Sequence, residues 1–402
     1  MYIQCTKKML DKLDSEKIGM VSADECDDGA DGFYSWHVNY ITINRRKVIV
    51  CMNNLTRYTI IIYRPKAKDI AHFESRIKEG IRTAFLEEGI PREMVEEYFR
   101  NCGDVKFSKT KDRRLLANLN QTCQIVQYYA ELLDEDAVVQ SRASLNLGRY
   151  MVKFEGQYEC PAHKLFRAFC RMRNIPEQDW EQILEIENYQ LKIRLMLEHY
   201  DIWRRILIPA RCTFEELHMA IQYTFGWFGY HLHEFSVVDQ NYKAEEGTPL
   251  YAYPKKIRIV DGEDPEVEQF LERDRYEVKY DTKTSLREIF EETDRCIYTY
   301  DFGDNWEHEI ILEKVERNSH NRILYLLEQK GERPPEDVGG EGGFEEYMRI
   351  VSDPENPEYE FMVQWSENTR ADQRTIEEIN RQLNRYYGYI GLDNRIKKEN
   401  EQ

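Results

Sequence analysis

The net charge of this chain changes near residue 150, and that change constrains its organisation more than any other sequence feature. Residues 1–150 contain 23 Lys and Arg against 22 Asp and Glu, a net charge of +1. Residues 151–402 contain 33 against 52, a net charge of −19. Two such different surfaces indicate at least two structural units. The acidic part would repel phosphates, which excludes nonspecific nucleic-acid binding there and favours a protein partner.

Length and composition restrict the class of protein. A chain of 402 residues corresponds to two or three domains, and its 41% of hydrophobic residues excludes a disordered or fibrous protein. No apolar run reaches the roughly 18 residues of a membrane span, and the first ten residues lack the apolar centre of a secretory signal. The nine cysteines form no C-x-x-C pair. We therefore expect reduced thiols, a cytoplasmic location and no membrane contact.

The first 135 residues predict an α+β domain. Segments rich in Ile, Val, Thr and Tyr alternate with segments in which apolar residues recur at helical spacing. The expected strands are 1–5, 36–44, 47–52, 56–63 and 105–110, and the expected helices are 7–13, 69–88, 91–100 and 115–133. The three strands between residues 36 and 63 are expected to form a meander or hairpin. The acidic segment 22–32 is typical of an exposed loop.

The rest of the chain predicts a connector and a second domain. Residues 136–188 have helical spacing and little Gly or Ser, which favours a helical connector that packs, with Pro161 at a helix start. Residues 189–390 predict a second α+β domain, in which Thr213 and Glu216 have the spacing of a capping box. Residues 391–402 form a charged tail. The fold class is therefore two α+β domains joined by a helical connector.

Four segments of the second domain carry a family resemblance. They are Tyr189–Arg205 (YQLKIRLMLEHYDIWRR), Thr213–Phe235 (TFEELHMAIQYTFGWFGYHLHEF), Tyr300–Ile310 (YDFGDNWEHEI) and Pro334–Tyr347 (PPEDVGGEGGFEEY). In order, spacing and motifs, residues 186–390 resemble the plasmid pRiA ORF-three-like family. The resemblance implies an α+β fold and an association with plasmids and transposable elements, but no biochemical role.

This chain departs from the family pattern at one place. Relatives often have cysteines flanking the PPED segment, where this chain has Arg333 and Val338. The resemblance therefore does not support a metal site that uses those thiols here. The first 135 residues resemble a separate domain family of unknown function, and the segments that carry this resemblance are Cys5–Lys8, Trp36–Asn39, Ile43–Lys47 and Asn53–Tyr58.

The segment HLH at 231–233 is the sharpest chemical pair in the sequence. On a strand, side chains at i and i+2 share a face, so two histidines can chelate one metal ion. The Tyr300–Ile310 motif offers further ligands for a divalent ion that would activate water. In this hypothesis the metal ligands are His231, His233 and His308, and the catalytic carboxylates are Asp301 and Asp304.

The alternative for these residues is a structural role. Trp227, Phe235, Phe302 and Trp306 supply apolar surroundings in which the histidines would form internal hydrogen bonds. Residues 303–305 are typical of a tight turn between two strands. The glycine-rich segment 339–343 lacks the Lys-Ser/Thr pair of a phosphate loop and follows acidic residues, so we interpret it as a flexible turn.

Cations of the first domain gather on an expected hairpin. Residues 45–47 follow a strand, and strand pairing would bring them near other basic side chains and an aromatic stacking face. Such a cluster would bind the phosphate of a nucleotide or nucleic acid. The predicted ligand-binding residues are Lys7, Lys8, Trp36, His37, Arg45, Arg46, Lys47 and Arg57. The alternative is a solvated hairpin whose charge is balanced by the acidic loop at 24–31 or by the acidic domain.

Two functional hypotheses follow from these patterns. The sequence contains no G-x-S-x-G elbow, dinucleotide fingerprint, kinase motif set or serine-recombinase signature. The leading hypothesis is a binding and regulatory protein associated with mobile elements or host conflict, in which the first domain binds an anionic ligand and the acidic domain a protein. The competing hypothesis is a metal-dependent hydrolase that acts on phosphodiesters. The sequence leaves open whether the chain is an enzyme.

Overall fold

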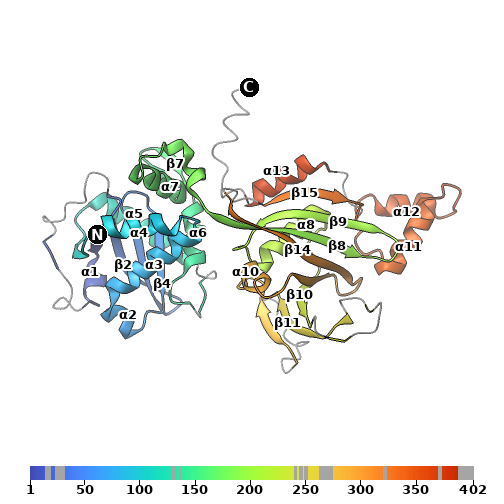
Figure 1. Ribbon diagram of the computed structural model, residues 1–402, viewed down its shortest axis with the longest axis horizontal. Coiled ribbons are helices and arrows are strands. Elements are labelled where there is room, and N and C mark those ends of the chain that lie inside the picture. Colours follow the sequence, from blue (N-terminus) through green and yellow to red (C-terminus); the bar gives the residue numbers. More distant parts are fainter. Residues whose placement is uncertain are drawn as a thin grey trace. The chain divides into compact units, whose positions relative to one another are not determined.

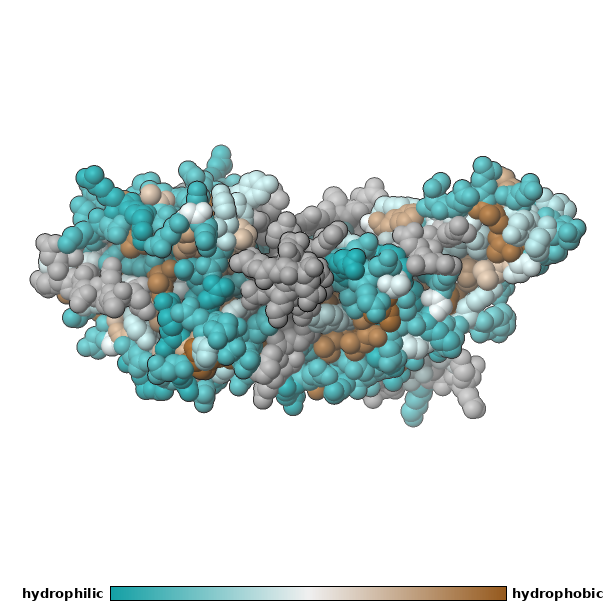
Figure 2. Space-filling view, turned by 90° about the horizontal axis from the view of Figure 1, so that it is seen from above, coloured by the Kyte–Doolittle hydropathy of each residue, from teal (hydrophilic) through white to brown (hydrophobic). Residues whose placement is uncertain are grey.

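The computed structural model divides the chain into two compact units, Met1–Glu185 and Ile186–Gln402 (Figure 1). It describes residues 1–13, 20–22, 32–128, 130, 133–135, 137–239, 242–243, 248, 252–261, 275–319, 324–369 and 374–387. The acidic segment 24–31 and the tail 391–402 lie outside these residues. Each unit combines a sheet with helices, which confirms the α+β class. The face seen in Figure 2 is mostly hydrophilic, in keeping with the 32% of charged residues.

The first unit is built on a five-stranded sheet in the order β4-β3-β2-β1-β5. Its strands are β1 (Tyr2–Cys5), β2 (Ser35–Ile43), β3 (Arg46–Asn53), β4 (Thr59–Tyr63) and β5 (Lys106–Lys109). β2, β3 and β4 form an antiparallel meander, as their Ile- and Val-rich segments predict. β1 lies between β2 and β5 and is parallel to both. The carboxyl ends of these three strands therefore point toward the same side of the unit.

Helices cover both faces of this sheet. They are α1 (Lys7–Leu10), α2 (Ala67–Ala71), α3 (Phe73–Glu87), α4 (Arg92–Asn101) and α5 (Arg113–Tyr128). On one face, Val50 packs in a core with Leu119 of α5. On the other, Trp36 contacts Phe85 of α3 and donates a hydrogen bond to the Tyr98 hydroxyl of α4. The alternation of side chains along the strands thus produces two cores.

The segment expected as a connector packs within the first unit. It forms α6 (Ser141–Arg149), β6 (Val152–Phe154), β7 (Gln157–Glu159), α7 (Pro161–Met172) and the 3-10 helix η2 (Glu177–Ile183). Arg149 donates two hydrogen bonds of 2.7 Å to the carboxylate of Glu88, and the Tyr58 hydroxyl donates one of 2.8 Å. Glu88 is fully buried. Gly148 permits this approach, because a Cβ there would lie 2.8 Å from the Tyr58 ring. The ion pair therefore joins α6 to the end of α3.

We expect Arg149→Met to lower the free energy of unfolding by about 3–5 kcal/mol, because it leaves the buried carboxylate of Glu88 without its cation. Adding Glu88→Gln should recover part of this loss, since the buried charge is then removed. Urea unfolding of the full chain measures both effects. Arg82→Met, which breaks the half-exposed pair with Glu96, is the control and should cost less than about 1 kcal/mol. Equal losses for Arg149→Met and Arg82→Met would contradict the argument.

The second unit is built on an eight-stranded sheet in the order β12-β11-β10-β13-β14-β8-β9-β15. Its strands are β8 (Ile186–Met196), β9 (Asp201–Pro209), β10 (His233–Val238), β11 (Lys255–Val260), β12 (Glu277–Tyr280), β13 (Arg295–Tyr300), β14 (Trp306–Ser319) and β15 (Tyr325–Lys330). In the centre, His233 pairs with Tyr300, and Tyr298 pairs with His308. This antiparallel register aligns the start of β10 with the end of β13.

Five helices accompany this sheet among the described residues: α8 (Phe214–Phe225), α10 (Leu286–Phe290), α11 (Gly340–Val351), α12 (Tyr359–Ser366) and α13 (Ile376–Tyr387). The Thr213 hydroxyl accepts a hydrogen bond from the Glu216 N–H, and the Glu216 carboxylate accepts one from the Thr213 N–H. The predicted capping box of α8 is therefore confirmed. The glycine-rich segment is not a flexible turn but begins α11, and a Cβ at Gly343 would collide with the Val338 carbonyl.

Candidate metal centre

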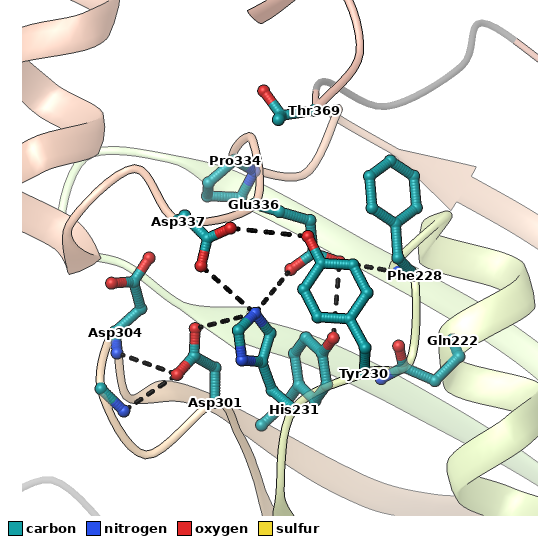
Figure 3. Close-up of polar contacts among 12 residues, drawn as sticks. Gln222, Phe228, Tyr230, His231, Asp301, Asp304, Pro334, Glu336, Asp337 and Thr369 are labelled. Atoms are coloured by element: carbon teal, nitrogen blue, oxygen red, sulfur yellow. Dashed lines mark hydrogen bonds and ion pairs between the residues drawn. The ribbon is translucent and has the colours of Figure 1, made fainter.

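Three segments meet at one end of the central strands of the second unit (Figure 3). The first follows α8, which ends at Gly226 in the left-handed conformation, and leads into β10. The second is the turn between β13 and β14, and the third is the loop that precedes α11. The Asp301 N–H donates a 3.0 Å hydrogen bond to the Leu232 carbonyl, which joins the first two segments. Each segment supplies an acidic or imidazole side chain to the same place.

The imidazole of His231 is the centre of this group. Its Nε2 atom lies 3.6 Å from an oxygen of Asp301, 3.3 Å from one of Asp337 and 3.9 Å from one of Glu336 (Figure 3). Ligand atoms of His231, Asp301 and Asp337 all lie within 4.8 Å of one another. Among the described residues, this is the one group of three or more His, Cys, Asp or Glu side chains whose ligand atoms lie close enough to hold a metal ion.

Asp301 is oriented by its own turn. Its backbone has φ +57°, a conformation that Asp tolerates better than most residues. One carboxylate oxygen, Oδ1, accepts hydrogen bonds from the N–H groups of Gly303 (2.9 Å) and Asp304 (3.4 Å). The other, Oδ2, therefore faces His231. The side chain is 10% exposed, so the turn fixes a nearly buried carboxylate.

Glu336 is a fully buried carboxylate at the base of the group. Its Oε1 accepts a 2.6 Å hydrogen bond from the Phe228 N–H and a 3.4 Å one from the Tyr300 hydroxyl. Its Oε2 has no hydrogen-bond donor among the described residues, and the same holds for Nε2 of His231. Burial raises the pKa of Glu336 above its ordinary value. Two buried polar atoms thus face each other without a hydrogen bond.

One side of the group is open to solvent. The Asp337 side chain is 60% exposed, and its Oδ2 accepts a 3.5 Å hydrogen bond from the Tyr230 hydroxyl. The nearby chain also exposes three aromatic side chains, Phe228, Tyr230 and Phe302. A small molecule could therefore reach the carboxylates from this side without a change of fold.

Of the two predicted catalytic carboxylates, only Asp301 faces His231. Asp304 does not belong to the group of ligand atoms. Its Oδ2 accepts a 3.1 Å hydrogen bond from the Gly339 N–H, which joins the β13–β14 turn to the start of α11. Gly340 allows this approach, because a Cβ there would lie 2.9 Å from the Asp304 carbonyl oxygen. Asp304 is therefore a positioning residue.

The structure does not bring His233 and His308 to His231. Residue 231 precedes β10, so the strand spacing on which the prediction relied begins only at His233. His233 Nε2 lies 3.1 Å from the Asp281 carboxylate, and its ring stacks on His218 at 3.6 Å. His308 is fully buried, with Nδ1 3.0 Å from the Trp306 carbonyl. These two positions correct the expected set of three histidine ligands.

Glu336 and Asp337 are the site residues that the sequence interpretation missed. Both lie in the PPED segment, which the sequence pattern marks only as an acidic neighbour of the glycine-rich segment. Arg333, one of the two positions at which the chain departs from the cysteine pattern, donates hydrogen bonds to the Gly226 carbonyl (2.6 and 2.9 Å) and to the Thr369 carbonyl (2.8 Å). Its guanidinium also lies over the ring of Trp227. Arg333 thus holds the loop by hydrogen bonds.

The predicted anion cluster of the first unit separates into three groups. Trp36 and His37 are fully buried, and Arg57 is buried with a hydrogen bond to Gln121, so these three residues belong to the core. The hairpin residues 45–47 are exposed at the opposite end of β2, where Arg46 pairs with Glu135. Lys7 and Lys8 are exposed on α1. Trp36 therefore offers no stacking face, because its ring is enclosed by α3 and α4.

Comparison with known proteins supports the division into two families. Residues 187–380 match the plasmid pRiA4b ORF-3-like protein family. Residues 2–164 match the domain of unknown function DUF6933. Both resemblances expected from the sequence are confirmed, and the matched C-terminal range contains all four residues of the candidate centre.

Two relatives each match slightly less than half of this chain. Over 184 residues the chain is 27% identical to "uncharacterized protein y4hQ" of Sinorhizobium fredii, which spans 45% of this chain and 83% of that protein. Its sequence is also 29% identical to that of "protein of unknown function MM3350" from Methanosarcina mazei Go1, for which a crystal structure is known. That match covers 48% of this chain and 96% of that one, with a TM-score of 0.38. Neither name states an activity.

Every helix in the described part of the chain is too short or too polar to cross a membrane.

Several titratable residues of the second unit are as buried as a core residue. Burial lowers the pKa of His308 to about 3, and burial together with the charge of His233 lowers the pKa of His218 to about 2. Both imidazoles are therefore neutral in the folded state at pH values where an exposed histidine gains a proton.

We expect the chain to lose stability as the pH falls below about 6.5, because the unfolded state then binds protons that the folded state excludes. Each buried imidazole should contribute about 1.4 kcal/mol per pH unit between its unfolded and folded pKa values. His308→Gln should reduce this slope. Urea unfolding at several pH values above 4 measures it. The exposed His199→Gln variant is the control, and a slope reduced equally by both substitutions would contradict the assignment.

Proposed function

We propose that the second unit binds a divalent metal ion through His231, Asp301 and Asp337. The observation that carries this proposal is a pair of buried atoms, His231 Nε2 and Glu336 Oε2. They lie 3.9 Å apart, next to other carboxylates, and neither has a hydrogen-bond partner among the described residues. Leaving buried polar atoms unsatisfied is costly, so such atoms require an explanation. A cation at this place would be coordinated by the imidazole and would neutralise the neighbouring carboxylates.

The spacing of the donors agrees with this proposal. A zinc ion with bonds of about 2.1 Å separates tetrahedral ligands by about 3.4 Å. His231 Nε2 lies 3.6 Å from the Asp301 oxygen and 3.3 Å from the Asp337 oxygen. One imidazole and two carboxylates suit Zn²⁺, Mn²⁺ or Fe²⁺ better than Cu⁺, which prefers sulfur ligands. No cysteine takes part, consistent with Arg333 and Val338 at the positions where relatives often have cysteines.

The reaction class that this arrangement supports is hydrolysis. Three protein ligands leave a coordination position for water, as in catalytic zinc sites. The metal would lower the pKa of that water and so supply the nucleophile. Glu336 lies beside the ligands, and its Oε2 accepts no hydrogen bond from the described residues. This oxygen could therefore accept the proton that the bound water loses. The open side at Asp337 would admit the substrate, for which we propose phosphodiesters. This grouping favours the hydrolase over a purely regulatory role.

We expect chelator-treated protein to bind one Zn²⁺ or Mn²⁺ per chain, measured by calorimetry and elemental analysis. Asp301→Asn should weaken binding at least about 100-fold, because it removes a charged ligand. Asp304→Asn is the matched control, since its amide oxygen can still accept from the Gly339 N–H. Equal loss in both variants, or no binding by the parent chain, would overturn the assignment.

We expect Glu336→Gln to retain the metal and to lower hydrolysis of bis(p-nitrophenyl) phosphate by about 10²–10⁴-fold, because it removes the proton acceptor. His231→Ala should lose both metal and activity. A carboxylic ester, p-nitrophenyl acetate, serves as the second substrate and identifies the bond that is cleaved. If the metal-loaded protein hydrolyses neither compound, the hydrolase proposal fails while the metal site stands.

A further inference from the structure

The carboxyl edge of the first sheet gathers cations that are independent of the metal centre. In β1, Cys5 pairs with Val38 of β2 and with Lys109 of β5, so the segments that follow β1 and β5 are neighbours. The Thr110 N–H donates a 3.1 Å hydrogen bond to the Cys5 carbonyl. Both α1 and α5 begin within a few residues of these strand ends. We call the cations there the basic edge: Lys7, Lys8, Lys109, Arg113 and Arg114.

The side chains of the basic edge are exposed and have no ion-pair partner among the described residues. Six other cations of the same unit are paired with carboxylates: Arg46, Arg64, Arg76, Lys78, Arg82 and Arg149. Five like charges on one edge repel one another, and an anionic ligand would remove that repulsion.

The carboxylate that directly precedes α5 already accepts hydrogen bonds from the backbone of the helix. Asp112 accepts hydrogen bonds from the N–H groups of Arg114 (2.7 Å) and Leu115 (3.0 Å), so it caps the helix. It offsets part of the positive charge without pairing with an arginine in the described structure. The guanidinium groups of Arg113 and Arg114 therefore remain available for bidentate contacts to phosphate.

We propose that the basic edge binds the phosphate backbone of duplex DNA. Its cations lie on or directly after two paired strands, which are about 4.8 Å apart, and duplex DNA carries one charge per about 1.7 Å of axis, so several phosphates can be contacted together. Proteins that bind single strands use exposed aromatic rings on which the bases stack. The segments 6–12 and 109–114 contain no aromatic residue. The edge is therefore suited to a duplex, in which only phosphates need to be reached.

The test measures binding of the full chain to a fluorescent duplex of about 20 base pairs as salt is raised. Five phosphate contacts predict a plot of log affinity against log salt with a slope of up to about −4.5. Arg113→Ala with Arg114→Ala should reduce the magnitude of this slope by about two and weaken binding at least about tenfold at low salt. Lys7→Ala with Lys8→Ala, on the other segment, should act in the same way.

Two controls separate the proposal from general charge effects. Arg92→Ala with Arg100→Ala removes two exposed cations from α4, which leads into the opposite end of β5, and should leave binding unchanged. Asp112→Asn keeps a helix cap, removes a negative charge and should tighten binding two- to threefold, by roughly the strength of one screened charge contact. Equal weakening by the α4 control would overturn the proposal.

Three other probes decide the identity of the ligand. Single-stranded DNA of the same length should bind less tightly than the duplex, because the segments 6–12 and 109–114 contain no aromatic ring on which bases could stack. Phosphatidylserine vesicles and inorganic phosphate should not compete at low concentration. Absence of salt-dependent duplex binding, or a preference for vesicles or for the single strand, would refute the proposal. Neither result would bear on the metal centre, whose residues lie in the other unit.

Discussion

The candidate centre depends on the left-handed backbone of Asp301 at the end of β13. This conformation is disfavoured for most residues and persists because the surroundings determine it. The Asp301 N–H donates to the Leu232 carbonyl, and the Asp301 carbonyl accepts a 2.6 Å hydrogen bond from the Asn305 N–H. One carboxylate oxygen is occupied by its own turn, so the other faces His231. The carboxylate is thereby placed by a turn that is anchored directly at the end of a central strand, which gives a more defined position than a free loop would.

The elements that the sequence predicted correctly are those with strong local signals. The capping box at Thr213, the antiparallel meander of the first sheet and the β13–β14 turn each depend on residues close together in the chain. Only part of the candidate site could be predicted from the sequence. His231 and Asp301 stand in motifs that suggested chemistry, whereas Glu336 and Asp337 come from a loop more than 30 residues further on, whose position depends on tertiary packing. Spacing alone could not show that β10 begins after His231.

The buried histidines of the second unit differ in the partners of their ring nitrogens. His233 is paired with Asp281, and His308 bonds a backbone carbonyl while remaining neutral. Both are consistent with the structural alternative that the sequence left open. His231 differs because its Nε2 faces carboxylates and has no hydrogen bond in the described structure. His231 and His233, two positions apart, thus have different surroundings. Their hydrogen-bond partners distinguish them, whereas residue type alone does not.

The ion pair between Glu88 and Arg149 also has a practical consequence for dividing this chain. A boundary near residue 135 appears natural from the sequence, since the pattern of strands and helices changes there. A fragment cut at that point would retain the acidic partner of a fully buried pair and discard the basic one. The first unit extends to residue 185 and therefore contains both partners. Recombinant fragments intended for crystallisation or for isolated study should therefore be separated between residues 185 and 186.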